Sequence, residues 1–227
     1  MKKILAATAL TLLLAGCTFV KFNKNDFRIA VNGIGDDVVH PYMTGAFSSV
    51  VLNIPADVDF HVSDTCRLSI SAPQNLHDII SVTCEDGVLM IGTIEGKKLG
   101  KDGVDVRLSA PVLSSVTVNG AAEIDIDSGL RTDSFDLTVN GAGDVEIDGL
   151  ETRKMDVRIN GAGDISTRLI GHADVGIEIN GAGDITLKGS AGSVNARING
   201  AGDIDTSDLE CTDITRNIMG LRHYKKN

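Results

Sequence analysis

A five-residue motif recurs five times between residues 118 and 204, and it constrains the fold of this chain more than any other feature. The motif is Asn-Gly-Ala-Gly-Asp, with Ala-Glu in place of Gly-Asp in its first copy. Its asparagines lie 21, 20, 20 and 19 residues apart, at Asn119, Asn140, Asn160, Asn180 and Asn199. A nearly constant interval without insertions is typical of an architecture in which each repeat stacks on the one before it.

Alternating apolar residues flank the motif. They precede the asparagine, as at Phe135, Leu137 and Val139, and they resume after it, as at Val145 and Ile147. A period of two indicates β-strands, and helical spacing is absent from this region. Each unit therefore predicts a strand, a sharp corner, a second strand and a return loop. We expect an all-β fold, a single-stranded right-handed parallel β-helix with roughly 20 residues per turn.

Stacked units would bring like residues into columns with a spacing of about 4.8 Å. The asparagines are predicted to form one such ladder, amide to amide. A second, acidic ladder is predicted beside it, from Glu123, Asp144, Asp164, Asp184 and Asp203. Carboxylates at this spacing repel by about 0.9 kcal/mol in water, so we expect them to stay solvated and to accept amide protons. The alternative is a ladder that binds calcium, as in glycine-aspartate β-rolls; we predict no metal and no cofactor.

The amino-terminal residues predict export and lipidation. Lys2 and Lys3 precede an apolar run that is too short for a confident membrane span. The run ends in Leu14-Ala15-Gly16-Cys17, which resembles a bacterial lipobox, in which the cysteine is acylated before cleavage. An acylated Cys17 would hold the chain at a membrane, because each buried methylene contributes about 0.8 kcal/mol.

These features divide the chain into four predicted parts. They are a lipoprotein signal peptide at 1–16, an anchor linker at 17–43, one β domain at 44–211, and a carboxyl-terminal tail or cap at 212–227. The predicted location is the cell envelope, lipid-anchored at the outer membrane, with the periplasmic and the surface face both open.

The net charge limits the classes of partner that we expect, and the cysteines limit the possible disulfides. The formal net charge is −10, and removal of Lys2 and Lys3 with the signal peptide makes it −12. Such a chain repels nucleic acid, so no nucleic-acid partner is expected. Cys66 and Cys84 flank two apolar runs and are the candidate pair for a disulfide, with two free thiols as the alternative.

No arrangement of residues predicts catalysis. The five histidines are scattered, and a ladder of equivalent carboxylates offers no separate acid and base. The chain has no tryptophan and two tyrosines, which leaves few aromatic platforms for sugars. We therefore expect no enzyme; the alternative is a β-helix enzyme or binding protein that acts on polysaccharide.

The order of segments resembles the bacterial GIN-domain family of auto-transporter adhesin head domains. The resemblance covers residues 44–211 and rests on Phe47–Leu52, Gly87–Ile91, Ala110–Leu113 and the repeated motif. It implies a β-helix, frequent lipoprotein export and no assigned catalysis. The first unit departs from the family pattern at Ala122-Glu123, so its corner is expected to differ.

These observations predict a non-catalytic envelope lipoprotein with an adhesin-like or scaffolding surface. Its expected partners are the membrane, through the lipid anchor, and another envelope or surface protein. Self-association at exposed strand edges is a further candidate. A purely structural envelope element without a discrete ligand is the alternative.

Overall fold

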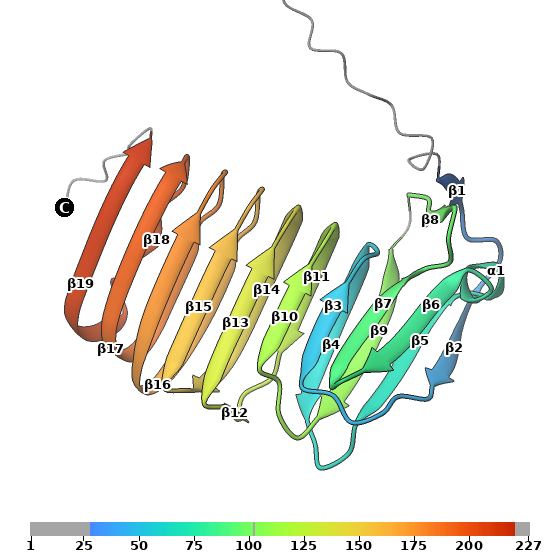
Figure 1. The fold of residues 1–227 in the computed structure, drawn as a ribbon, viewed down its shortest axis with the longest axis horizontal. Helices are drawn as coiled ribbons and strands as arrows, with labels where there is room; N and C mark the ends of the chain where they lie inside the picture. Colours follow the sequence, from blue (N-terminus) through green and yellow to red (C-terminus); the bar gives the residue numbers. More distant parts are fainter. Residues whose placement is uncertain (1–27, 102, 221–227) are drawn as a thin grey trace, which may run out of the picture.

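A computed structural model describes residues 28–101 and 103–220 of the chain (Figure 1). The predicted signal peptide and Cys17 lie outside these residues. The described chain is almost entirely β-structure, with a single short helix among the described residues. The elements of the first half are β1 (Ile29–Val31), β2 (Asp37–Tyr42), β3 (Ser49–Leu52), β4 (Ala56–Val62), β5 (Arg67–Pro73), α1 (Gln74–His77), β6 (Ile80–Glu85), β7 (Val88–Thr93), β8 (Lys97–Leu99) and β9 (Val104–Ala110).

The second half carries the repeats. Its strands are β10 (Ser115–Val118), β11 (Ala121–Ile126), β12 (Leu130–Arg131), β13 (Ser134–Val139), β14 (Ala142–Glu151), β15 (Lys154–Ile159), β16 (Ile165–Ile179), β17 (Ile185–Gly200), β18 (Ile204–Asp205) and β19 (Leu209–Gly220).

The prediction of a single-stranded right-handed parallel β-helix is wrong. In the described chain, β1 and β8 form a small parallel sheet, and the other 17 strands join in one sheet that mixes the two strand directions. β5 runs antiparallel to both β2 and β9, and β6 runs antiparallel to β7. The mixed sheet curls around the core as a nearly closed barrel, with its antiparallel strands at the β2 and α1 end (Figure 1).

A two-residue turn explains one of these reversals. β6 and β7 are joined by Asp86 and Gly87, and Glu85 pairs with Val88. Both turn residues have positive φ, 50° at Asp86 and 78° at Gly87. Two consecutive positive φ values are the geometry of the tight turn that joins antiparallel strands, and Asp-Gly is a preferred sequence for it. The dipeptide was therefore a hairpin signal, and the prediction of uniform parallel strands overlooked it.

From β10 onward the strands of the described chain pair in parallel. Successive passes lie one repeat apart, so that Leu137 pairs with Val157 and Val157 with Ile177. These side chains point inward and are buried, as their alternation predicted. Each fully buried side chain of this size contributes about 1.5–3 kcal/mol. One continuous apolar core therefore runs beneath both the mixed and the parallel part of the sheet.

The sheet extends beyond the expected limits of the β domain. β1 and β2 lie within the predicted linker at 17–43, and β19 continues past residue 211 to Gly220. Within the described ranges, no helix is long and apolar enough to cross a membrane.

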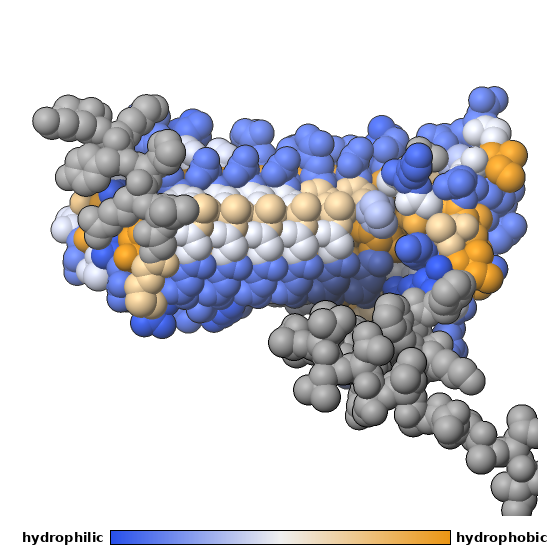
Figure 2. Space-filling model, turned by 90° about the horizontal axis from the view of Figure 1, so that it is seen from above, coloured by the Kyte–Doolittle hydropathy of each residue, from blue (hydrophilic) through white to orange (hydrophobic). Residues whose placement is uncertain are grey.

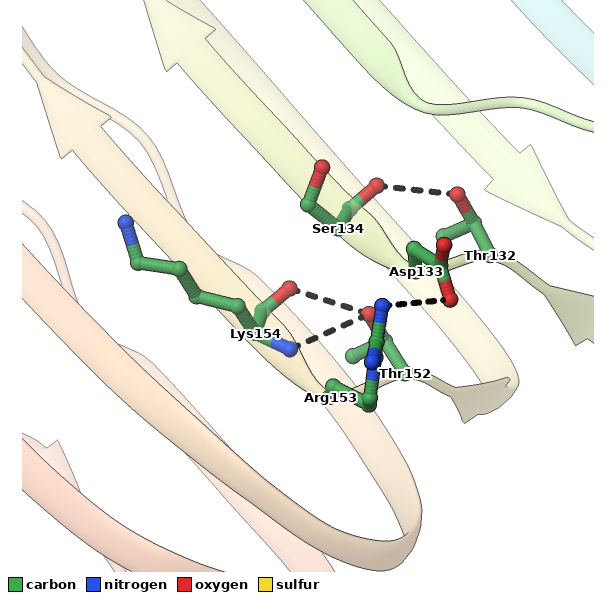
Figure 3. A network of polar contacts seen from close by, with 6 residues as sticks. All are labelled: Thr132, Asp133, Ser134, Thr152, Arg153 and Lys154. Carbon is green, nitrogen blue, oxygen red and sulfur yellow. Dashed lines mark hydrogen bonds and ion pairs between the residues drawn. The ribbon is translucent and has the colours of Figure 1, made fainter.

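The return corners are ordered by threonine hydroxyls (Figure 3). Thr132 Oγ donates to the carbonyl of Ser134, and Thr152 Oγ donates to the carbonyl of Lys154, both at 2.9 Å. An ion pair between Arg153 and Asp133 spans the same corner at 3.0 Å. Both side chains of this ion pair are largely exposed, so the pair contributes little to the stability of the fold. The hydroxyl bonds, repeated one turn apart, are the local determinant of this corner.

Thr167 provides a test of the core. It occupies an inward position between Ile147 and Leu187, is fully buried, and its hydroxyl has no hydrogen-bond partner in the structure. A buried hydroxyl without a partner costs about 1–3 kcal/mol. Thr167→Val should therefore raise the free energy of unfolding by about 1–2 kcal/mol in urea titration. Thr152→Val, which removes a bonded hydroxyl, should lower it. A loss of stability in Thr167→Val would contradict this description of the core.

Candidate functional site

A groove runs along the corners that the repeated motif forms. Its volume is about 1130 Å³, and it extends from the Pro55 and Gly103 end to Asp203. Figure 2 shows this face as a pale and light orange band that follows the long axis of the molecule between hydrophilic borders. Five exposed alanines form the floor, in register with one another: Ala121, Ala142, Ala162, Ala182 and Ala201.

Each repeat of the chain forms one turn of the stack, and successive turns approach each other closely at the motif. This close approach explains why the motif contains glycines. A Cβ on Gly161 would lie 2.0 Å from the carbonyl oxygen of Gly141, and a Cβ on Gly163 would lie 2.2 Å from that of Gly143. The same approach recurs in the following turns, at Gly181 and Gly183. No side chain fits at such distances, so two columns of glycine are required wherever the turns stack. The floor of the groove is therefore flat and consists of methyl groups and bare backbone.

The asparagines form one continuous column. The side-chain amide of Asn140 donates to Asn119 Oδ1, that of Asn160 to Asn140, that of Asn180 to Asn160, and that of Asn199 to Asn180, at 2.9–3.1 Å. Every amide donates toward the previous turn. The column is a hydrogen-bonded strut that fixes the register of the corners beside the groove.

The acidic residues form the second column. Glu123 lies in register with Asp144, and all five acidic side chains of the column are exposed. The backbone amide of Asp164 donates to Asp144 Oδ1 at 3.2 Å, and that of Asp184 donates to Asp164 Oδ1 at 3.0 Å. The amide of Asp203 donates to Asp184 Oδ1 at 2.8 Å. The carboxylates of Asp144, Asp164 and Asp184 thus accept backbone amides of the next turn, and all five acidic side chains line the groove with negative charge.

Both columns begin earlier than the motif does. Asn119 donates to Asn53 Oδ1 at 2.9 Å, and Glu123 lies in register with Asp57. The sequence analysis missed this pair, because Ile54-Pro55-Ala56 replaces the glycines and 66 residues separate Asn53 from Asn119. The four-residue spacing from asparagine to acid is nevertheless the same as in every motif, and it was the available signal.

The first copy of the motif stacks in register with the others, although Ala122-Glu123 replaces Gly-Asp there. Ala122 pairs with Gly143, and the corner continues directly into β11. A Cβ on Gly143 would lie 3.5 Å from the carbonyl oxygen of Ala122, compared with 2.2 Å between the corresponding positions one turn later. The stacking is therefore looser at this one position of the first corner, where an alanine is accommodated, although Gly120 and Gly141 approach as closely as their counterparts in later turns.

Of the two alternatives for Cys66 and Cys84, a disulfide or two free thiols, the structure has the free thiols. Cys211 is a free thiol as well. Cys66 Sγ donates to the carbonyl of Phe47 at 3.9 Å, and Cys84 Sγ donates to that of Ala46 at 3.7 Å. Both thiols thus contact consecutive backbone carbonyls of the segment before β3.

The acidic column is not arranged as a metal site. Across residues 28–101 and 103–220, no group of three or more histidine, cysteine or acidic side chains is placed to hold a metal ion. Successive carboxylates lie one turn apart, and those of Asp144, Asp164 and Asp184 each bind a backbone amide of the next turn. The geometry offers a negative edge for a long ligand and no compact cage for an ion.

The groove and its two polar columns form a repetitive surface on an all-β fold, and comparison with known proteins identifies the family of the chain. The profile described as "Putative auto-transporter adhesin, head GIN domain" matches residues 46–175 and 156–221. The chain belongs to this family. No curated protein matches the chain.

Solved structures share the fold at low sequence identity. A crystal structure named as a putative adhesin from Bacteroides fragilis has a TM-score of 0.68 and 21% identity, with 85% of this chain and 97% of that chain covered. One named as a putative lipid binding protein from Parabacteroides distasonis has 0.59 and 16%, with 85% and 97% covered. A putative adhesin from Parabacteroides merdae has 0.52 and 20%, with 85% and 99% covered. The names refer to adhesion or to lipid binding, and the likeness concerns the fold.

Gly141→Ala tests the close approach of the turns. Its Cβ would lie 2.0 Å from the carbonyl oxygen of Gly120, so the stack must open. We expect the free energy of unfolding to fall by about 2–3 kcal/mol. Gly120→Ala is the matched control, because it changes the same motif position but its nearest neighbour, the carbonyl oxygen of Ile54, is 4.0 Å away. The control should change stability by less than about 1 kcal/mol. Equal losses in urea titration would refute the steric argument.

Asn160→Ala tests the asparagine column. It removes two amide bonds, one to Asn140 and one from Asn180, whereas Asn199→Ala removes the single bond to Asn180. A hydrogen bond contributes about 0.5–1.5 kcal/mol net, so the first variant should lose about twice as much stability as the second. Thermal melting followed by circular dichroism measures both losses. A larger loss for Asn199→Ala would show that the column does not act through these bonds.

Proposed function

We propose that this chain is an exported lipoprotein of the cell envelope, whose folded part acts as an adhesin-like head and holds an extended segment of another protein in its groove. The observation that carries the proposal is the unbroken floor of alanine and glycine beside a column of exposed carboxylates. Family membership supports an adhesin-like role at the surface or in the envelope. The lipobox at Leu14–Cys17 supports an anchor at Cys17.

The dimensions of the groove favour an extended polypeptide. The acidic column has one member in each of six turns, from Asp57 to Asp203, so five spacings of parallel strands make the groove about 24 Å long. A strand of about seven residues spans that length. The small floor residues let a backbone approach closely, and the rigid stack requires no ordering on binding. Both properties favour a shallow, continuous contact along a chain.

The charge of the groove favours a basic ligand. Asp144, Asp164 and Asp184 line one side, and Asp125 and Glu146 continue the acidic surface beyond them. Lysine or arginine side chains of a bound segment would meet these carboxylates, whereas anionic lipids would be repelled. The lipid-binding name of the Parabacteroides distasonis neighbour therefore supports our proposal less than the adhesin names do.

The proposed role is non-catalytic. The carboxylates of the groove repeat in equivalent surroundings, and acid–base chemistry requires two groups whose environments differ. Within the stack, the carboxylates of Asp144, Asp164 and Asp184 accept hydrogen bonds from backbone amides. Toward a ligand, the carboxylates of the groove present a line of negative charge.

A substitution on the groove floor tests the proposal. Ala162→Gln adds a neutral side chain at an exposed position in the middle of the groove. We expect it to weaken capture of the partner from a solubilised envelope extract about tenfold, which corresponds to about 1.4 kcal/mol. Asn195→Gln is the matched control, since Asn195 is exposed outside the groove, in a separate depression beside Arg158 and Arg197.

The outcomes are distinct. Saturable binding that Asn195→Gln retains and Ala162→Gln loses supports the groove as the contact surface. Equal binding by both variants places the contact elsewhere on the molecule. Absence of any saturable partner at micromolar concentration would favour a purely structural role in the envelope.

A further inference from the structure

The end of the molecule where the described chain begins exposes apolar side chains. We call residues 28–43 and 94–101 the β1–β2 end; β1 and β8 pair there, beside β2 and α1 (Figure 1). Twelve large apolar side chains are exposed in the described chain, and six of them lie in this end: Ile29, Ile34, Val38, Val39, Met43 and Ile94. Figure 2 shows strongly hydrophobic surface gathered at this end. Such a concentration indicates a contact surface.

The charge of this end differs from that of the rest of the molecule. It carries four cationic side chains, at Arg28, Lys97, Lys98 and Lys101, against three anionic ones. The remaining described residues carry ten cationic and 26 anionic side chains. Register places Lys97 directly beside Ile29, so cationic and apolar groups lie side by side. The β1–β2 end thus escapes the acidity that would repel an anionic surface.

The exposed apolar groups are held by fixed backbone. His77 is buried beneath β2, where its Nε2 contacts the carbonyl oxygen of Val38 at 2.9 Å and its Nδ1 contacts Tyr42 Oη at 2.9 Å. Because its neighbours at Nε2 are carbonyls, Nε2 carries the proton and Nδ1 accepts from the tyrosine. Burial raises the pKa of Tyr42, which keeps its hydroxyl a donor. Asn75 holds the turn at Ile34 through a bond to the Ile34 amide at 2.9 Å.

The predicted lipid anchor lies next to this end in the sequence. Arg28 lies eleven residue steps after Cys17, so the connecting segment spans at most about 38 Å when fully extended. The opposite end, at β19, lies seven strand spacings from β7 along the stack, or about 34 Å further away. An acyl group on Cys17 would therefore attach the chain to the bilayer through the segment that leads directly into the β1–β2 end.

We propose that the β1–β2 end seats on the phospholipid bilayer that holds the chain's own lipid anchor. The exposed apolar side chains enter the boundary between headgroups and acyl chains, and the lysines contact lipid phosphates. The stack then projects away from the bilayer, with the groove presented along its length. This inference rests on the proposed lipid anchor at Cys17.

A single-tryptophan reporter tests the inference, because the chain has no tryptophan. Met43 is fully exposed, so Met43→Trp places an indole at the β1–β2 end without disturbing the core. Met219→Trp is the matched control at the opposite end, where Met219 is 58% exposed. Each variant is purified as the acylated protein, its acylation is verified by mass spectrometry, and it is reconstituted into vesicles of brominated phosphatidylcholine with a minority of phosphatidylglycerol.

We expect the indole of Met43→Trp to lose most of its emission to the brominated chains and to shift to shorter wavelength, and that of Met219→Trp to remain unquenched. Ile34→Trp, at another exposed position of the same end, should behave like Met43→Trp. Adding Lys97→Gln and Lys98→Gln to Met43→Trp should reduce the quenching. Circular dichroism confirms that each variant is folded.

Three failures can be told apart. A protein that floats with the vesicles but leaves Met43→Trp and Ile34→Trp unquenched is anchored without seating, which overturns the inference and assigns the apolar end to a protein partner. A chain that carries no acyl group, or that does not float with the vesicles, overturns the anchor itself and the inference with it. Equal quenching at both ends would show adsorption without a preferred orientation and would also overturn the inference.

Discussion

The close approach of successive turns at their corners is the constraint on which the rest of this structure depends. At Gly161 and Gly163, the carbonyl of the turn below occupies the space that a side chain would need. Two glycine columns therefore fix the height and the register of every turn. The asparagine column, the carboxylate column and the inward rows of valine and isoleucine all follow from that register, because each requires its members to lie directly above one another.

The sequence predicted most where its repeat was regular. The interval between motifs identified which residues lie above one another, and the alternation around them identified the buried set, as at Leu137 and Val157. It predicted least in the first half of the chain. The reversal at Asp86-Gly87 was readable from turn chemistry, but no glycine or proline marks residues 63–66 between β4 and β5. That reversal depends on pairing of β5 with β2 and β9, which are distant in sequence.

The sequence analysis missed the first members of the two polar columns because they lie far from the repeats in the sequence. Asn53 and Asp57 continue both columns, yet β5 to β9 intervene before the next asparagine, so the periodicity is interrupted in the sequence and preserved in space. The sequence also left open whether Cys66 and Cys84 are bonded or free, and the structure has them free. Cys66 and Cys84 are symmetric about a loop in the sequence, whereas in the fold each thiol is directed at a different backbone carbonyl. Spacing along a chain predicts contacts only where the chain repeats.

The two polar columns are used by the fold itself, and the surface they frame is what remains for a partner. Asparagine amides bind one another, and aspartate carboxylates bind backbone amides of the next turn. Their presence therefore needs no ligand to explain it. Two features are not explained by the polar columns or by the glycines: the row of exposed alanine methyl groups on the groove floor, and the apolar, cationic end of an otherwise acidic molecule.

The uniform direction of the asparagine bonds has a consequence for how such a molecule changes size. Each interior unit donates to its predecessor and accepts from its successor, so every interior unit presents the same two faces to its neighbours. One unit of the middle region could be copied or deleted in frame and leave no orphaned amide. A change of length by whole units, each adding or removing about 4.8 Å of height, would therefore keep every remaining unit paired and leave both terminal caps untouched.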